Sequence, residues 1–448
     1  MNLNASPTPP AIAAPLAPPA PPATPATPAL PVHAAMDQFG VRDGELVVGG
    51  LTVSALAAQV GRTPFYAYDR ALMLARVATL RAALPSGLLL HYAMKANPLP
   101  AVVQLMAGLA DGVDVASAGE LQVALAAGAR PAGISFAGPG KRDAELQAAV
   151  RAGVLVNVES ARELPVLAAA SQALGLPARV AVRVNPDFEL KGSGMKMGGG
   201  PKPFGVDAEA VPGLLARIGE LGLAFEGFHL YAGSQTLRAD ALCQAQTLSY
   251  ELALRLADHA PAPVRSLNLG GGFGIPYFPG EKRLDLAPVA AVLAGLVERA
   301  RSELPQAALV LELGRYLVGE AGVYVARVID RKVSRGQVFL VVDGGLHHHL
   351  SASGNFGQVL RRNYPVAIGN RMHDPCDLQR DLQRDMPREV ATVVGPLCTP
   401  LDLLADRMPL AVAQEGDLVV IFQSGAYGAS ASPQGFLGHP TCAEVLVG

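Results

Sequence analysis

Several ionisable side chains in this sequence come directly after short apolar segments. Lys95 is preceded by the apolar residues 88–90 and by Met94, and Glu312 and Arg315 stand at the end of a later apolar segment. A lysine with apolar neighbours loses hydration, so its pKa is expected to fall, and its neutral amine can form a Schiff base with an aldehyde. Each of these residues taken alone is more often solvated or ion-paired. The hypothesis of a reactive site therefore depends on a fold that brings them together.

A run of three glycines offers a second kind of chemistry. Residues 270–272 are all glycine and follow another apolar segment. Backbone N–H groups without Cβ atoms beside them can approach a phosphate closely, and the Ser234 hydroxyl can add a donor. The spacing to Pro276 does not give the GxGxxG pattern of a dinucleotide-binding helix. A tight strand-to-helix turn without a ligand explains the run about equally well.

Together these residues match the needs of one cofactor. Pyridoxal phosphate requires a lysine for its aldehyde, an anion-binding cradle for its phosphate and a partner for its ring nitrogen. Lys95, the glycine run with Ser234, and Glu312 would supply these three parts. A carboxylate that keeps the ring nitrogen protonated strengthens the cofactor as an electron sink. This favours decarboxylation over racemisation, which can proceed with a weaker sink.

These residues can meet only if the fold collects the ends of several strands. Short apolar segments alternate with Ala- and Leu-rich helical segments, as is typical of a parallel sheet covered on both faces. Eight repeats favour a closed (β/α)8 TIM barrel, with its active site at the C-terminal strand ends, over a doubly wound open sheet. The strands are expected at residues 88–94, 113–115, 134–136, 155–158, 180–184, 225–231, 266–269 and 309–313.

Composition divides the chain into four parts. Residues 1–31 hold eleven prolines and lack the charged and apolar regions of a signal peptide. After residue 313, strand-like segments follow one another without long helices, which predicts an antiparallel β domain. The predicted parts are a disordered Pro/Ala-rich tail, residues 1–33; a segment with a hairpin that joins the β domain, residues 34–61; the barrel, residues 62–316; and the C-terminal β domain, residues 317–448.

Charge and cysteine content exclude several classes of partner. The chain has 36 Lys and Arg against 38 Asp and Glu, a net charge of −2, and no long basic run, so nucleic acid is not expected. Its apolar stretches are shorter than the ~20 residues of a membrane span. The four cysteines are scattered without a CxxC pattern, which predicts no metal cluster and a cytoplasmic location.

Seven motifs in order resemble the fold-type III pyridoxal-phosphate decarboxylases, the family of diaminopimelate, ornithine and arginine decarboxylases. They are YAMKAN at 92–97, DVAS at 114–117, GSQ at 233–235, GGGFG at 270–274, ELGR at 312–315, GPLC at 395–398 and GAY at 425–427. The resemblance begins near residue 64 and continues to the C-terminus. It implies an alanine racemase-like barrel with a β domain, pyridoxal 5′-phosphate as cofactor, and a homodimer with shared active sites.

The resemblance also implies a role for each matching residue. Lys95 would hold the cofactor as a Schiff base. Cys398 would reprotonate the carbanion by reaching the partner subunit's site, although a buried structural cysteine is the alternative. The other implied cofactor contacts are Asp114, Arg183, Tyr231, Ser234, Gly271, Gly272, Glu312, Arg315 and Tyr427, and the implied substrate contacts are Arg315, Asp343, Thr399 and Tyr427.

Three positions depart from the family pattern. Tyr231 stands where a histidine usually stacks on the pyridine ring, and Leu313 stands where proline is usual. Thr399 follows Cys398, where diaminopimelate decarboxylases have Glu and ornithine decarboxylases have Asp to recognise the distal amine of the substrate. An uncharged residue there suits a substrate without a free distal charge. These departures resemble the exosortase-associated decarboxylases and the butirosin-type branch, which acts on glutamate tethered to a carrier protein.

The segment after residue 346 also differs from the usual Arg-Pro-x-x-Tyr pattern. His347, His348 and His349 are consecutive, and consecutive strand residues point to opposite faces, so substrate or interface contact is favoured over metal binding. Arg361 and Arg362 are candidates to meet a phosphopantetheine phosphate or an acidic carrier surface, although a solvated arginine pair is the default.

The predicted function is decarboxylation, with pyridoxal phosphate, of an amino acid or of a carrier-protein-tethered aminoacyl group. The alternatives are meso-diaminopimelate decarboxylation and, less favoured, an amino-acid racemase. A non-enzymatic cofactor-binding protein is disfavoured, because such proteins are typically single barrels without a β domain.

Overall fold

The computed structural model describes residues 32–189, 195–196, 198–372 and 387–448. Most of the predicted tail, residues 1–31, lies outside this range. The last two residues of that predicted tail are described. His33 is buried and its ring Nε2 lies 2.9 Å from the carbonyl oxygen of Asn363, while the Val32 carbonyl accepts a hydrogen bond from Gly280 N.

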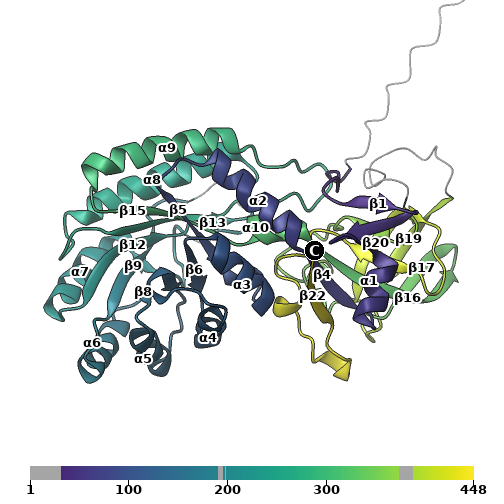
Figure 1. The fold of residues 1–448 in the computed structure, drawn as a ribbon, viewed down its shortest axis with the longest axis horizontal. Coiled ribbons are helices and arrows are strands. Elements are labelled where there is room, and N and C mark those ends of the chain that lie inside the picture. The colour runs from purple at the N-terminus through teal and green to yellow at the C-terminus, as the bar shows by residue number, and fades with distance from the viewer. Residues whose placement is uncertain (1–31, 190–194, 197, 373–386) are drawn as a thin grey trace, which may run out of the picture. The chain divides into compact units, whose positions relative to one another are not determined.

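Eight parallel strands form a closed barrel, as predicted (Figure 1). Closure follows from the pairing of the last barrel strand with the first. This pairing brings Glu312 beside His91, and the register of two other neighbouring strands brings His229 beside Arg183. The strands are β5 (Leu88–Ala93), β6 (Gly112–Val115), β7 (Ile134–Phe136), β8 (Leu155–Val158), β9 (Arg179–Asn185), β12 (Ala224–Leu230), β14 (Ser266–Gly271) and β15 (Ala308–Leu313).

Helices alternate with these strands and cover the barrel. Side-chain caps start several of them: Ser117 accepts a hydrogen bond from Glu120 N, and Asp285 accepts one from Ala287 N. Left-handed glycines end others, as at Gly153. The helices are α2 (Arg70–Ala83), α3 (Pro100–Leu109), α4 (Ala118–Ala126), α5 (Asp143–Ala152), α6 (Glu163–Leu174), α7 (Val211–Glu220), α8 (Ala239–Ala257), α9 (Leu286–Glu303) and the short α10 (Arg315–Val318). Among the described residues, no helix has the length and apolar character needed to cross a bilayer.

A second, mostly antiparallel sheet follows the barrel in the sequence. Two of its pairings, β17 with β19 and β4 with β22, are parallel, so the sheet is mixed rather than purely antiparallel. Strand β4 comes from within the range predicted for the barrel but pairs with β16 and β22 of this sheet. The strands are β4 (Phe65–Asp69), β16 (Gly322–Ser334), β17 (Gln337–Val342), β18 (Val366–Ile368), β19 (Arg388–Val394), β20 (Leu403–Ala411), β21 (Leu418–Ile421) and β22 (Ala443–Val447).

The N-terminal segment packs on this second sheet. Strands β1 (Gly40–Arg42), β2 (Glu45–Val48) and β3 (Leu51–Thr52) form an antiparallel meander, followed by α1 (Val53–Val60). Both residues of the β2–β3 turn are glycines with positive φ, which a two-residue hairpin of this kind requires. Buried side chains of this segment share one apolar cluster with residues of β4, β16 and β21.

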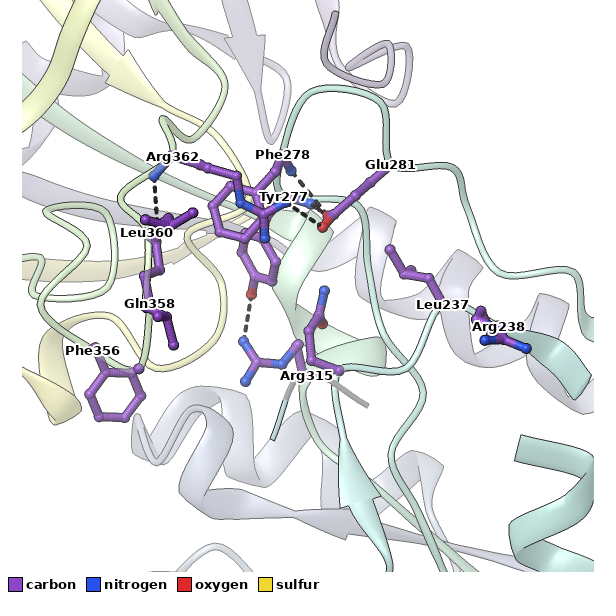
Figure 2. Close-up of a pocket in the computed structure, with 13 residues that line it drawn as sticks. Leu237, Arg238, Tyr277, Phe278, Glu281, Arg315, Phe356, Gln358, Leu360 and Arg362 are labelled. Atoms are coloured by element: carbon purple, nitrogen blue, oxygen red, sulfur yellow. Dashed lines mark hydrogen bonds and ion pairs between the residues drawn. The ribbon is translucent and has the colours of Figure 1, made fainter. Parts of the chain in front are cut away.

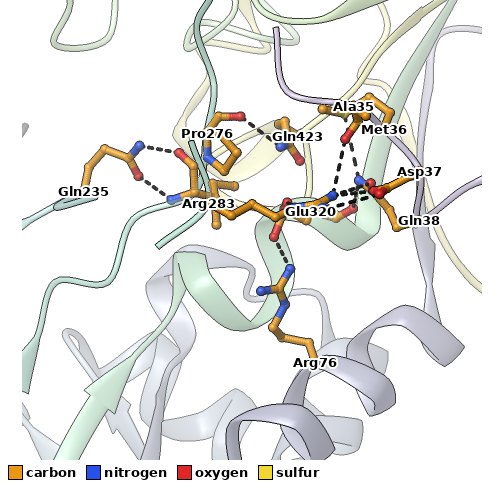
Figure 3. A network of polar contacts seen from close by, with 11 residues as sticks. Ala35, Met36, Asp37, Gln38, Arg76, Gln235, Pro276, Arg283, Glu320 and Gln423 are labelled. Carbon is orange, nitrogen blue, oxygen red and sulfur yellow. Dashed lines mark hydrogen bonds and ion pairs between the residues drawn. The ribbon is translucent and has the colours of Figure 1, made fainter. Parts of the chain in front are cut away.

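A polar network holds the loop before α9 against the N-terminal segment (Figure 3). Arg283 forms an ion pair of 2.6 Å with Asp37 and lies 3.4 Å from Glu320. Glu320 is buried and also pairs with Arg76 of α2. In the same region, the Gln235 amide bonds to both the N–H and the carbonyl of Ile275. The stretch from Ile275 to Arg283 is therefore anchored at both of its ends.

The three consecutive histidines are core residues of the β domain. His347, His348 and His349 are each at most 1% exposed. The His349 ring contacts Ser424 Oγ at 2.8 Å, and His348 Nε2 lies 2.8 Å from the Pro440 carbonyl. Neither ring nitrogen of His347 has a described hydrogen-bond partner. This burial does not support the expected surface contact with a substrate or an interface.

We predict that these histidines make the fold sensitive to acid. Burial lowers the pKa of His347 to about 4 and that of His349 to about 3. Their folded pKa values lie below the unfolded value, so the unfolded state takes up protons first and stability is lost as pH falls from about 6.5 towards these values. Each histidine contributes a slope of up to about 1.4 kcal/mol per pH unit.

His347→Phe tests this prediction, because it removes a titrating ring that makes no described hydrogen bond. The free energy of unfolding, measured by urea denaturation between pH 7 and pH 4.5, should fall less steeply in the variant than in the wild type. His259→Phe, at an exposed position, controls for the substitution itself. Parallel slopes for wild type and His347→Phe would contradict the prediction.

Candidate active site

Lys95 lies at the C-terminal mouth of the barrel. It sits in a 3₁₀ turn, Met94–Ala96, directly after β5. Its Nζ atom is 3.8 Å from Glu312 Oε1 on the neighbouring strand β15. The Lys95 side chain is 42% exposed while that of Glu312 is 5% exposed, so the amine faces an opening and the carboxylate lies beneath it.

The expectation of a lowered lysine pKa is wrong for this arrangement. Desolvation by the surrounding protein would lower the pKa of Lys95, but the Glu312 carboxylate, with smaller effects of Tyr427 and Tyr231, raises it above its usual value. The apolar residues before Lys95 are therefore outweighed by an acid more than two hundred positions later. In the ligand-free protein the amine is protonated.

Glu312 has a second polar partner, which comes from β12. His229 Nε2 lies 3.0 Å from Glu312 Oε2, and both side chains are at most 5% exposed. Burial would raise the pKa of Glu312, but the His229 hydrogen bond and the Lys95 charge lower it to about 2. His229 had no assigned role in the sequence interpretation. Its signal was its position two residues before Tyr231, which places it on the same strand face.

Asp114 and Arg183 surround this centre without lining the cleft. Asp114 Oδ1 lies 3.0 Å from His91 Nδ1, and its Oδ2 is buried with no described hydrogen-bond partner. Burial raises the pKa of Asp114. Arg183 forms a buried ion pair of 2.7 Å with Glu159. From β6 and β9, which do not pair with β15, Asp114 and Arg183 interact electrostatically with Glu312: its charge raises the pKa of Asp114, and the Arg183 charge lowers the pKa of Glu312.

One narrow cleft collects most of the predicted cofactor residues. Its lining also includes apolar side chains from the ends of β5 and β15. Tyr427 comes from the β domain, so the cleft lies where barrel and β domain meet. Within the cleft, the Nζ atom of Lys95 is 5.4 Å from the centre of the Tyr231 ring. The predicted residues that line the cleft are Lys95, Tyr231, Ser234, Gly272, Glu312, Arg315 and Tyr427.

The glycine run is required by close backbone packing. A Cβ at Gly271 would lie 1.9 Å from the Glu312 carbonyl oxygen. Gly272 has a φ of +80°, and a Cβ there would lie 2.3 Å from the carbonyl oxygen of Gly233. Gly233 and Ser234 form the short strand β13 (Gly233–Ser234). The backbone of residues 271–272 therefore packs closely against the strand that carries Ser234, at one side of the cleft.

Arg315 closes the other side of the cleft. Its guanidinium donates a hydrogen bond of 2.9 Å to Tyr277 Oη and lies 4.6 Å from the centre of the Tyr427 ring. Its Nε–H is buried without a described acceptor. The backbone of Tyr427 is itself held by a hydrogen bond of 2.7 Å from its N–H to the Ala96 carbonyl. The arginine is therefore held in place and keeps one buried donor without a described acceptor.

Cys398, Thr399 and Asp343 also do not line the cleft of their own chain. Cys398 is exposed, and Thr399 Oγ1 accepts a hydrogen bond from Leu401 N within the same turn. Asp343 has both carboxylate oxygens engaged, by Arg327 N at 2.8 Å and by the Thr63 hydroxyl. These two hydrogen bonds give Asp343 a structural role. Within one chain they do not support contact of Asp343 with a substrate.

The chain is similar to several known decarboxylases. Residues 70–319 match the family described as "Pyridoxal-dependent decarboxylase, pyridoxal binding domain". The L-glutamyl-(BtrI acyl-carrier protein) decarboxylase of Niallia circulans is 38% identical over 86% of this chain and 88% of that protein. The diaminopimelate decarboxylase of Aquifex aeolicus is 33% identical over 91% of each. A crystal structure of the Helicobacter pylori diaminopimelate decarboxylase, complexed with L-lysine, superposes with a TM-score of 0.74 at 26% identity and covers 88% of this chain and 93% of that chain.

We predict that Glu312 controls the protonation of Lys95. Glu312→Gln removes the carboxylate that opposes the effect of burial, so the pKa of Lys95 in the ligand-free protein should fall. The measurement is the pH dependence of acetylation of Lys95, followed by peptide mass spectrometry. The exposed Lys332 in the same samples serves as an internal reference. An unchanged Lys95 profile would show that the carboxylate does not set its charge.

Proposed function

The chain belongs to the pyridoxal-dependent decarboxylase family, and we propose that its substrate is an aminoacyl group tethered to a carrier protein. The observation that carries this proposal is Thr399, which follows Cys398 and offers only a hydroxyl at a position where relatives that act on diamino acids carry an acid. The similarity to a decarboxylase of a glutamyl carrier protein supports it. A tethered substrate presents no free distal charge for that position to recognise.

The cleft fits pyridoxal 5′-phosphate. Lys95 offers an amine to the opening, and the buried Nε–H of Arg315 lacks an acceptor, as expected beside an anion that completes the site. Gly272 and Ser234 bring backbone and hydroxyl donors to the same cleft. Glu312 is suited to hold a ring nitrogen protonated. When bound, the cofactor supplies the electron sink for the bond that breaks.

The residues of this chain would then divide the remaining tasks. Glu312 stays ionised because His229 donates to it from beneath, so its charge is maintained throughout the working pH range. Tyr231 offers an aromatic face where a histidine is usual. Burial raises the pKa of Tyr231 to about 12, so its hydroxyl stays protonated and does not act as a base near neutral pH.

Cys398 would deliver the proton that replaces the lost carboxyl group, acting on the partner subunit's cleft. Its exposure, and its absence from the cleft of its own chain, support a homodimer in which each site is completed by the second subunit. Its turn is held in place, because Asp402 accepts a hydrogen bond from Leu397 N and another from Leu346 N. The cytoplasmic location expected from the scattered cysteines is part of the same proposal.

A second candidate function is decarboxylation of free meso-diaminopimelate. It is favoured by the identity of about one third that several diaminopimelate decarboxylases share with nearly the whole chain. It requires a charged partner for the distal ammonium, and Thr399 provides none. Racemisation is the weaker alternative, because Glu312 is ionised and paired.

Subunit mixing tests the shared site. Lys95→Ala and Cys398→Ala should each be inactive alone. After subunit exchange, a heterodimer contains one cleft with both residues intact, so about a quarter of wild-type activity should return to an equal mixture. Exchange is verified independently with differently tagged subunits. Exchanged but inactive mixtures would place both residues of each site on one chain.

Substrate competition tests the role of Thr399. The kcat/KM for L-glutamyl-carrier protein should exceed that for free meso-diaminopimelate by at least about a hundredfold, since an unpaired buried ammonium costs several kcal/mol. Thr399→Glu should shift preference towards the diamino acid, while Thr399→Ser should not. Efficient turnover of meso-diaminopimelate by the wild type would favour the second candidate.

A further inference from the structure

A larger groove adjoins the cleft that contains Lys95. It has a volume of about 720 Å³ and lies between two barrel loops, residues 235–238 and 277–281, and the β-domain segment 356–362 (Figure 2). Arg315 lines both the groove and the cleft, so the two spaces adjoin at that residue. A groove of this size suits a ligand much larger than a free amino acid.

The walls of this groove combine apolar surface with positive charge. Three arginines and one glutamate line it, which gives it a net positive charge. Three apolar side chains of its β-domain wall face solvent: Phe356 is 40% exposed, Leu360 80% and Val359 99%. Such a local concentration of exposed apolar side chains indicates a surface that is covered by a ligand.

The two consecutive arginines of this segment have different surroundings. Arg361 is used by the fold, because its guanidinium donates to the carbonyls of Ser353 and Leu403 and to the Asn363 side chain. Arg362 instead stacks on the Phe278 ring, with its guanidinium carbon 3.8 Å from the ring centre, and its side chain is 51% exposed. Among the described residues, its only ion-pair partner is Glu281, at 3.5 Å.

Glu281 holds the loop rather than neutralising Arg362 fully. Its Oε2 accepts hydrogen bonds from Tyr277 N and Phe278 N, at 2.9 and 3.1 Å. The carboxylate is therefore fixed by the loop, and only Oε1 reaches the guanidinium. Arg362 is positioned by stacking on one face while N–H donors remain for an anion at the exposed rim of the groove.

We propose that this groove binds the 4′-phosphopantetheine arm of a carrier protein, with Arg362 contacting the phosphate and the thioester end directed towards Arg315. The inference rests on the proposed function, since a tethered substrate needs such a path. Complementary chemistry supports the proposal. The arm carries its phosphate at one end, where the groove offers arginines, and apolar and amide groups along its length, where the groove offers apolar side chains. Arginine is suited to a phosphate because it donates in parallel pairs.

The test uses the holoenzyme and three probes. The first probe, γ-L-glutamyl-S-4′-phosphopantetheine, is joined through the side-chain carboxyl, so its α-carboxylate is free to leave as CO2, and it carries the phosphate. The second, γ-L-glutamyl-S-pantetheine, lacks the phosphate, and 4′-phosphopantetheine itself lacks the aminoacyl group. Arg362→Ala should raise the KM of the phosphorylated thioester about tenfold and weaken binding of 4′-phosphopantetheine by the same factor, with no change for the pantetheine thioester. Leu360→Asp should weaken all three, because it places a negative charge in the apolar wall.

Two arginines serve as controls. Arg301→Ala, at an exposed position of α9 outside the groove, should leave all three probes unaffected. Arg238→Ala removes the other exposed arginine of the groove. A phosphate-dependent loss in Arg238→Ala but not in Arg362→Ala would overturn the assignment of the phosphate to Arg362.

The remaining outcomes separate this inference from the proposed function. If the wild type turns over the thioesters and Arg362→Ala behaves like the wild type, the groove assignment fails and the proposed function stands. If the wild type turns over no thioester, the proposed function fails, and direct binding of 4′-phosphopantetheine decides the assignment. Dissociation of dimers in Leu360→Asp, by sedimentation velocity, would assign the groove to a second copy of the chain and overturn the proposal.

Discussion

The buried negative charge of Glu312 is the interaction on which the site depends. Its carboxylate contacts Lys95, in the turn after β5, and His229, on β12. An isolated charge at this depth would be neutralised by a proton, but the Lys95 charge and the hydrogen bond with His229 lower the pKa of Glu312 and keep it ionised. The closed barrel is what makes this possible, because it brings β5, β12 and β15 to one rim. The same charge sets the protonation of Lys95.

The β domain completes a site that the barrel begins. Tyr427 reaches the cleft from the second sheet, and its backbone is bonded to Ala96 beside the lysine. The loop that carries Tyr277 is held by the network around Arg283 and Glu320, and Tyr277 in turn positions Arg315. Polar contacts therefore run from the N-terminal segment to the Arg315 side of the cleft. Cys398 is the exception, since its own chain gives it no place in the cleft.

The two spaces at the domain junction differ in chemistry. The cleft is narrow, lined by charged and aromatic groups, and suited to a cofactor held by many contacts. The groove outside it is wide, largely apolar and positive at its rim. This division is consistent with a protein that holds its cofactor tightly and receives a long, flexible substrate from outside. A free amino acid would leave most of the groove empty.

The barrel could be predicted from the sequence because short, mostly apolar segments alternate with helical segments, and the motifs identified the predicted residues that line the cleft. The sequence misjudged the charge state of Lys95, because apolar neighbours along the chain said nothing of Glu312. The sequence assigned no role to His229. It treated Arg361 and Arg362 as an equivalent pair, although the fold uses only Arg361, and it expected substrate or interface contact from three histidines that are buried. Only the tertiary structure decided these points, since pKa values, ion pairs and burial depend on groups far apart in sequence that the fold brings within a few ångströms.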